Sequence, residues 1–244
     1  MSHALLACFP HPDDETFAVA GTLRHYHRAG TAVALWTATD GEAGSDNGVR
    51  GAPGALARTR RVELLRAAGV LGVDRLWAPG FPDGGLAALA PARLRASLHA
   101  AFGAVRPQVV ITFGPEGAPT GHADHQALSR AVTALVADLQ RAGAPEAPAR
   151  LYYCTWTPAE DAPTHRPSGA PRVAPATPVT CRVDVRDALA VKRAAFEAHR
   201  SQHHHRAEFE RDVLGPVEEY GLAAGLPGTV PQPAPLTDDL FAGL

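Results

Sequence analysis

The chain has 244 residues, of which 45% are hydrophobic and 20% are charged, so it can bury one large core. A formal net charge of −2 provides no basic surface for nucleic acid, and the expected partner is a small molecule. The N-terminus MSHALLACFP has no basic leader and its apolar run is broken by Pro10 and His11, which argues against a signal peptide or membrane span and favours the cytoplasm. Three scattered cysteines argue against a disulfide framework and against a thiolate metal site.

Short apolar runs and longer helical patterns alternate along the chain. Strands are predicted at 4–9, 32–38, 75–79, 108–113 and 150–156, and helices at 58–69, 91–105 and 122–140. A later edge strand at 179–185 and a helix at 186–202 follow. Continuous apolar runs are typical of strands buried on both faces. The alternation predicts an α/β fold that is Rossmann-like, with a mostly parallel sheet and helices on both faces.

Three segments interrupt this alternation. Residues 40–57 are rich in glycine, residues 158–178 are rich in proline, and the tail from about 226 is again rich in proline. Long insertions of this kind serve as binding loops or lids, or they are disordered. We therefore expect one domain, 1–244, with two loops and a tail attached to it.

The motif HPDDE follows the first predicted strand. Acidic residues and Pro12 suit the first turn of a helix, so the motif could be no more than a helix start. That interpretation leaves His11 without a task. Ligands in open α/β sheets bind beyond the carboxyl ends of the strands, which is where this motif lies.

A second motif, TGHADHQA at 120–127, follows the strand at 108–113 and opens the next helix. Residues three apart share a helix face, which pairs His11 with Asp14 and His122 with His125. Two histidines and one carboxylate around an open position form a catalytic zinc arrangement, and a similar set binds Fe²⁺ in non-haem oxygenases. The spacing leaves His122 and His125 interchangeable as ligands.

PHPDDE together with GHADH resembles the zinc-dependent LmbE-like, or PIG-L, deacetylases, which remove acetyl groups from N-acetylglucosaminyl compounds. TDGEAG (39–44), RRVE (60–63), FPDGGL (81–86) and KRAAFEAHRSQ (192–202) extend the resemblance over most of the chain. The resemblance implies Zn²⁺, the single donor set visible in the sequence predicts one ion per chain, and Fe²⁺ is the other compatible ion. The resemblance also implies His11, Asp14 and His125 as the metal ligands.

The same resemblance implies the catalytic residues. Asp13 would be the general base, and His122 would stabilise the oxyanion or protonate the leaving amine, with Asp124 orienting it. Arg60 and Asp83 match positions that look like sugar contacts.

Further polar residues have weaker assignments. Glu42 ends the second strand at the same sheet edge and is a third candidate for the substrate side, although carboxylates in glycine-rich turns also bond local backbone. Glu15 is expected to serve the helix start. The consecutive His203, His204 and His205 cannot all face one point, so we interpret them as a solvated helix end.

The expected function is zinc-dependent hydrolysis of the acetyl amide of an N-acetylglucosaminyl conjugate, such as a precursor of a low-molecular-weight thiol. The alternatives are an amidase of the same family that acts on thiol conjugates, a non-haem Fe(II) oxygenase, and a non-catalytic sugar-binding module. Asp13 beside the predicted ligands favours hydrolysis, because a base next to a metal-bound water has an evident task there. The chain could also form a homo-oligomer.

Overall fold

The computed structural model describes residues 3–45, 52–155, 173–223, 225–226 and 236–244. Residues 46–51 of the predicted loop 40–57, residues 158–172 of the loop 158–178, and residues 227–235 of the tail lie outside the described part. The strands are β1 (Ala4–Phe9), β2 (Ala32–Thr37), β3 (Arg75–Trp77), β4 (Val109–Phe113), β5 (Arg150–Thr155), β6 (Cys181–Asp184) and β7 (Val217–Leu222). The α-helices are α1 (Asp14–Ala18), α2 (Ala20–Arg28), α3 (Ala55–Leu71), α4 (Pro91–Val105), α5 (Ala123–Ala142), α6 (Leu189–Ala198) and α7 (Arg206–Glu208).

One seven-stranded sheet organises the described part of the chain, in the order β3-β2-β1-β4-β5-β7-β6. The pairs from β3 to β5 are parallel, whereas β7 pairs antiparallel with β5 and with β6. The α/β prediction, the five parallel strands and the edge position of 181–184 are therefore confirmed. Strand β7, which lies between β5 and the edge strand, was not predicted from the sequence.

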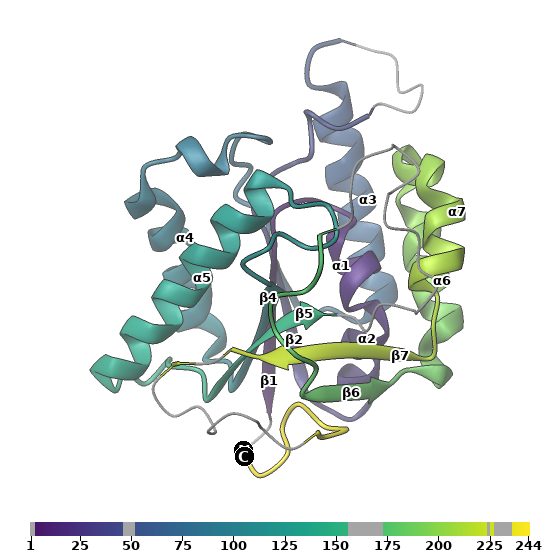
Figure 1. Ribbon diagram of the computed structural model, residues 1–244. Helices are drawn as coiled ribbons and strands as arrows, with labels where there is room; N and C mark the ends of the chain where they lie inside the picture. Colours follow the sequence, from purple (N-terminus) through teal and green to yellow (C-terminus); the bar gives the residue numbers. More distant parts are fainter. Residues whose placement is uncertain (1–2, 46–51, 156–172, 224, 227–235) are drawn as a thin grey trace.

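The helices form a layer on each face of the sheet (Figure 1). Helices α4 and α5 cover one face, where Leu98 and Leu135 pack against alternate strand residues such as Leu6. Helices α2, α3 and α6 cover the other face, where Leu64 joins the cluster that contains Leu5. Neighbouring residues of β1 thus point into different cores, which explains the uninterrupted apolar run ALLACF.

Local sequence determines where the helices begin and end. Pro91 stands at the first turn of α4, where its missing N–H costs nothing. The side chain of His122 caps α5, and Gly143 ends that helix in the left-handed conformation. The long predicted helix 186–202 is instead α6 with a short 3₁₀ helix before it and another, Arg200–His205, after it.

A buried ion pair holds β7 in place. Lys192 Nζ on α6 lies 2.6 Å from Glu218 Oε1 on β7, and both residues are nearly inaccessible to solvent. The Glu218 carboxylate also accepts hydrogen bonds from the backbone N–H groups of Gly21 and Thr22, in α2. One carboxylate therefore links β7, α6 and α2.

The structure also bears on membrane-spanning helices and on the state of the cysteines. None of the helices in the described residues is both long enough and apolar enough to cross a bilayer. Cys8, Cys154 and Cys181 are all free and buried.

Candidate active site

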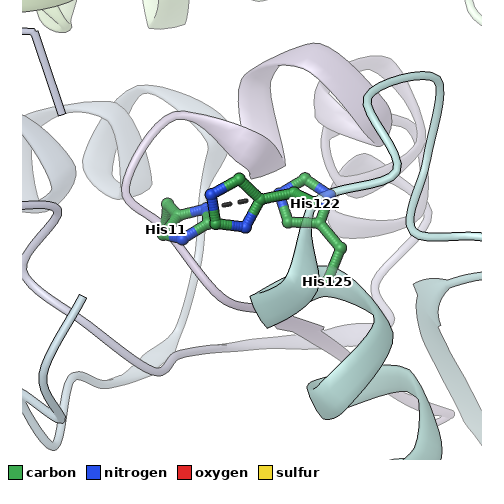
Figure 2. Close-up of side chains that lie close together, drawn as sticks. All are labelled: His11, His122 and His125. Carbon is green, nitrogen blue, oxygen red and sulfur yellow. Dashed lines mark hydrogen bonds between the residues drawn. The ribbon is translucent and has the colours of Figure 1, made fainter. Parts of the chain in front are cut away.

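The two sequence motifs meet at the carboxyl ends of β1 and β4. The strand order reverses between these two strands, and this switch point is where open α/β sheets leave a crevice for ligands. His11 lies just after β1, whereas His122 and His125 lie at the start of α5, which follows β4. Figure 2 shows the three imidazole rings gathered at one point, and ring nitrogens of all three lie within 4.8 Å of one another.

Donor atoms of His11, Asp14 and His125 lie close together. His11 Nδ1 lies 3.2 Å from His125 Nε2 and 3.4 Å from Asp14 Oδ2, and His125 Nε2 lies 3.5 Å from Asp14 Oδ1. Donor atoms bound to one tetrahedral zinc ion at about 2.0–2.1 Å lie about 3.3–3.4 Å apart. The spacing of the three side chains therefore suits a single small divalent ion, and all three line the cleft described below.

The charges of this group favour a cation. Burial alone would lower the pKa of His11, but the carboxylates of Asp124, Asp14 and Asp83 outweigh burial and raise it to about 12. Burial lowers the pKa of His125 to about 4. Burial would raise the pKa of Asp14, but the adjacent His125 and His11 hold it below its usual value. His125 and Asp14 are thus ready to bind a metal ion, whereas His11 must first release a proton.

The second nitrogen of His11 faces two carboxylates. His11 Nε2 lies 3.0 Å from Asp83 Oδ1 and 3.4 Å from Asp124 Oδ2. A metal-binding histidine commonly donates its other N–H to a carboxylate, which fixes the ring and the tautomer. Asp83, for which a sugar contact was expected, thus lies directly against His11.

The Asp124 carboxylate bonds a neighbouring turn and contacts His11, and the expected role of Asp124 in orienting His122 stays a prediction. The carboxylate accepts hydrogen bonds from the backbone N–H groups of Gly84 and Leu86, in addition to its contact with His11. The turn at 84–86 offers unpaired N–H groups, and a buried carboxylate satisfies them. It is the backbone N–H of Asp124 that donates to His122 Nδ1, at 3.2 Å. The exposed His122 ring therefore presents Nε2 to its surroundings.

Asp13 sits in an unusual backbone conformation next to the donor group. Its φ is 106°, a region that non-glycine residues adopt at a cost of about 1–3 kcal/mol. Its side chain lies 3.2 Å from Arg60 Nη2. Burial raises the pKa of Asp13 to about 6, even though Arg60 opposes the rise. A carboxylate with a raised pKa and a strained backbone is typical of a functional position.

Arg60 is a buried side chain that joins three segments. It donates to Pro12 O and, at 2.9 Å, to Gly41 O, and it contacts Asp13. Gly41 has φ +69°, and a Cβ at this position would collide with the Arg60 guanidinium, so the close approach requires glycine. Arg60 also lines the cleft, but its polar contacts are with protein groups. Its expected contact with a sugar remains a prediction.

Glu42 lies in an exposed turn beside Asp83. Glu42 Oε1 accepts a hydrogen bond from the backbone N–H of Asp83, and Asp83 Oδ2 accepts one from the backbone N–H of Ala43. These reciprocal bonds tie residues 42–43 to the turn at 83. Glu42 therefore bonds the backbone of a neighbouring turn, as carboxylates in glycine-rich turns often do. Its contact with substrate stays a prediction.

A cleft of about 1080 Å³ opens in front of the donor group. His11, Asp13, Asp14, His122 and His125 line one part of it, and Phe17, His204, His205 and Arg211 line another. The histidine run is only partly a solvated helix end, because His204 is exposed whereas His203 and His205 are half-buried against aromatic rings. The contribution of this run to the cleft was not predicted from the sequence, since it depends on how the late helices fold back.

Sequence and structure comparisons place the chain among known proteins. The profile of the family described as PIG-L: GlcNAc-PI de-N-acetylase matches residues 6–136, just over half of the chain. A 1D-myo-inositol 2-acetamido-2-deoxy-alpha-D-glucopyranoside deacetylase from Rhodococcus opacus is 35% identical over 240 residues, with 81% of each chain covered.

Two solved structures share the fold. The conserved protein TT1542 from Thermus thermophilus is 29% identical, with a TM-score of 0.66 and coverage of 93% of this chain and 96% of that one. The N,N'-diacetylchitobiose deacetylase from Pyrococcus horikoshii is 21% identical, with a TM-score of 0.69 and coverage of 93% and 85%. The second likeness bears on the fold alone. The profile match and the Rhodococcus relative confirm the resemblance that the motifs HPDDE and GHADH indicated, and the chain belongs to the PIG-L family of GlcNAc-PI de-N-acetylases.

Proposed function

We propose that this protein is a metal-dependent deacetylase that hydrolyses the acetyl amide of an N-acetylglucosaminyl compound. The observation that carries the proposal is the donor group of His11, Asp14 and His125, which has mutual distances of 3.2–3.5 Å and lines a cleft. The name of the Rhodococcus opacus relative supports the substrate class, because that protein is a deacetylase of an acetamido sugar linked to inositol.

The three donors would hold one Zn²⁺, or Fe²⁺ as the other compatible ion, per chain. Such an ion lowers the pKa of a bound water and polarises the acetyl carbonyl. Asp83 and Asp124 would hold the His11 ring in place through its Nε2, so that Nδ1 stays directed at the ion. These two carboxylates would therefore orient the metal-binding side chain of His11. Contact of Asp83 with a sugar remains open to test.

The remaining residues have roles in moving protons. Asp13 removes a proton from the attacking water while the water oxygen adds to the acetyl carbon. The C–N bond then breaks, and the sugar amine leaves with a proton while acetate forms. His122, whose Nε2 faces the cleft, supplies hydrogen bonding to the oxyanion or the proton for the amine. Arg60 holds Asp13 near the site by contacting both its carboxylate and the adjacent backbone.

A screen for acetate release tests the proposal. Zinc-loaded protein is incubated with N-acetylglucosaminyl inositol, N-acetylglucosaminyl malate and N,N'-diacetylchitobiose, and free acetate and free amine are measured. The proposal expects equal amounts of both products from at least one of these compounds, and loss of turnover with chelator. Turnover that consumes dioxygen would favour the oxygenase, and binding without acetate release would favour a sugar-binding module. A parallel incubation uses a thiol conjugate, and release of amine from that conjugate but from none of the three sugars would favour the related amidase.

A further inference from the structure

A fully buried pair, His199 and Glu15, lies directly behind Asp13. His199 Nε2 is 2.6 Å from Glu15 Oε1, and neither side chain is accessible to solvent. His199 ends α6 within the segment EAHRSQ, which the proposed reaction does not otherwise use. Its Nδ1 has no hydrogen-bond partner among the described residues, so the hydrogen bond to Glu15 is the ring's polar anchor there.

Glu15 connects this pair to the backbone of Asp13. Glu15 Oε2 accepts a hydrogen bond of 3.0 Å from the backbone N–H of Asp13, while Oε1 accepts from His199 and from the Thr16 hydroxyl. The N–H that Glu15 holds belongs to the residue with φ 106°. A carboxylate that is fixed by His199 on one oxygen can therefore fix the strained peptide with the other.

The charges of the segment make such a partner necessary. Asp13, Asp14 and Glu15 are three consecutive acidic residues with little exposure to solvent. Asp14 faces His11 and His125, and Asp13 faces Arg60 from α3. Glu15 extends to the place where α6 ends, and there His199 donates to it beside the Thr16 hydroxyl. Loss of the His199 donor would leave the buried Glu15 carboxylate with one hydrogen bond fewer, so the carboxylate would turn toward other donors.

We propose that His199 is a positioning residue for the reaction: through Glu15 it holds the backbone of Asp13 in the conformation that aims the Asp13 carboxylate at the attacking water. This inference rests on the proposed function, in which Asp13 is the base. It differs from a purely structural role, because it requires the orientation of Asp13, and not the fold or the metal ligands, to depend on the His199–Glu15 hydrogen bond.

The test compares His199→Ala with His199→Gln, whose amide N–H can replace the Nε2 donor. His199→Ala is expected to lower kcat by about 10- to 100-fold, the scale on which a misplaced catalytic group reduces rate. KM should stay within about twofold and metal content near one ion per chain, since neither the substrate cleft nor the donor group changes. His199→Gln should recover kcat to within about threefold of the wild type, because the donated hydrogen bond is restored.

Ser201→Ala is the matched control. Ser201 lies two residues later in the same buried segment, but its N–H and hydroxyl bond Glu63 on α3 instead of Glu15. Ser201→Ala should lower the melting temperature as His199→Ala does. Its kcat should stay within about twofold of the wild type, because Asp13 keeps its contacts. If His199→Ala does not fold, Glu15→Gln carries the same test, since an NH₂ group takes the place of one of the two oxygens that accept from the Asp13 N–H and from His199.

Crystal structures of the variants provide a measurement that does not need activity. The φ of Asp13 should leave its positive value in His199→Ala and keep it in His199→Gln and Ser201→Ala. A kcat at the wild-type level in His199→Ala, an equal loss in Ser201→Ala, or an unchanged φ of Asp13 would overturn the inference. If the wild type releases no acetate from any substrate, the proposed function fails instead, and the φ of Asp13 still decides whether His199 positions it.

Discussion

Replacing Asp13 by asparagine is expected to make the metal-free protein more stable while it removes activity. In the folded protein, burial raises the pKa of Asp13 from 3.8 to about 6. Above pH 6 the ionised carboxylate therefore opposes folding, since the unfolded chain ionises it more easily. Asparagine has nearly the same shape and carries no charge, so it avoids this penalty.

The size of the effect follows from the pKa. At about 1.4 kcal/mol for each tenfold change in the ionisation constant, a rise from 3.8 to about 6 amounts to about 3 kcal/mol. The side chain has 15% of its surface exposed, so solvent screening removes little of this penalty. The gain in unfolding free energy should be full above pH 6 and should vanish as the pH falls below 3.8, where Asp13 is protonated in both states. A bound dication would lower the pKa of Asp13 and so reduce the gain.

Urea unfolding of both proteins, without metal, at pH 7.5 and at pH 4 measures this difference. Asp83→Asn is the matched control, because contact with His11 lowers the pKa of Asp83 to about 2 and its replacement should therefore destabilise the fold at neutral pH. In the metal-loaded protein, kcat of Asp13→Asn should fall by about 10²–10⁴, the contribution usual for a general base. A lower stability of Asp13→Asn at pH 7.5, or a difference that does not change with pH, would refute this reasoning.

Three more outcomes are expected. Asp14→Asn should weaken metal binding by more than about 100-fold, as measured by competition with a chelator. Changes in residues that only support a metal ligand cost up to about 100-fold, and Asp14 is proposed to bind the ion directly. The value of kcat/KM should fall at acid pH with an apparent pKa below 6, since Asp13 must be ionised and the bound ion lowers its pKa from about 6. If the same fall at acid pH persists in Asp13→Asn, the titrating group is a residue other than Asp13. Lys192→Met should reduce stability by about 3–5 kcal/mol because it leaves the Glu218 carboxylate buried and unpaired, and adding Glu218→Gln should restore most of the loss in the melting temperature.

The parallel part of the sheet could be predicted because its strands are unbroken apolar runs between helical patterns. Strand β7 could not, since VEEYGL contains two acids and a glycine, and only the burial of Glu218 against Lys192 makes it compatible with an inner position. That ion pair joins two segments of the chain, α6 and β7, and no local sequence pattern indicates it. The propensity of the isolated segment was outweighed by its tertiary partners.

For the candidate site, the motifs indicated which residues would lie close together but not every contact among them. The spacing of three residues correctly brought His11 next to Asp14, because both belong to one short turn. The position of Asp124 against His11 depends on a turn at 84–86 that supplies N–H groups from a separate segment. Likewise, the meeting of Glu15 and His199 across 184 residues requires the end of α6 to pack behind α1. Such contacts follow from the packing of helices and not from motif spacing.

The position of β7 has a consequence for how the protein is made. Strand β5 ends at Thr155, but the strand that covers its outer edge is complete only at Leu222. During synthesis at about 5–20 residues per second, the nascent chain therefore presents the open edge of β5 for several seconds. An uncovered edge strand is a template for pairing with other chains. A ribosome that stalls before β7 has emerged would leave a product that contains the whole parallel sheet and both sequence motifs, and yet is prone to aggregate.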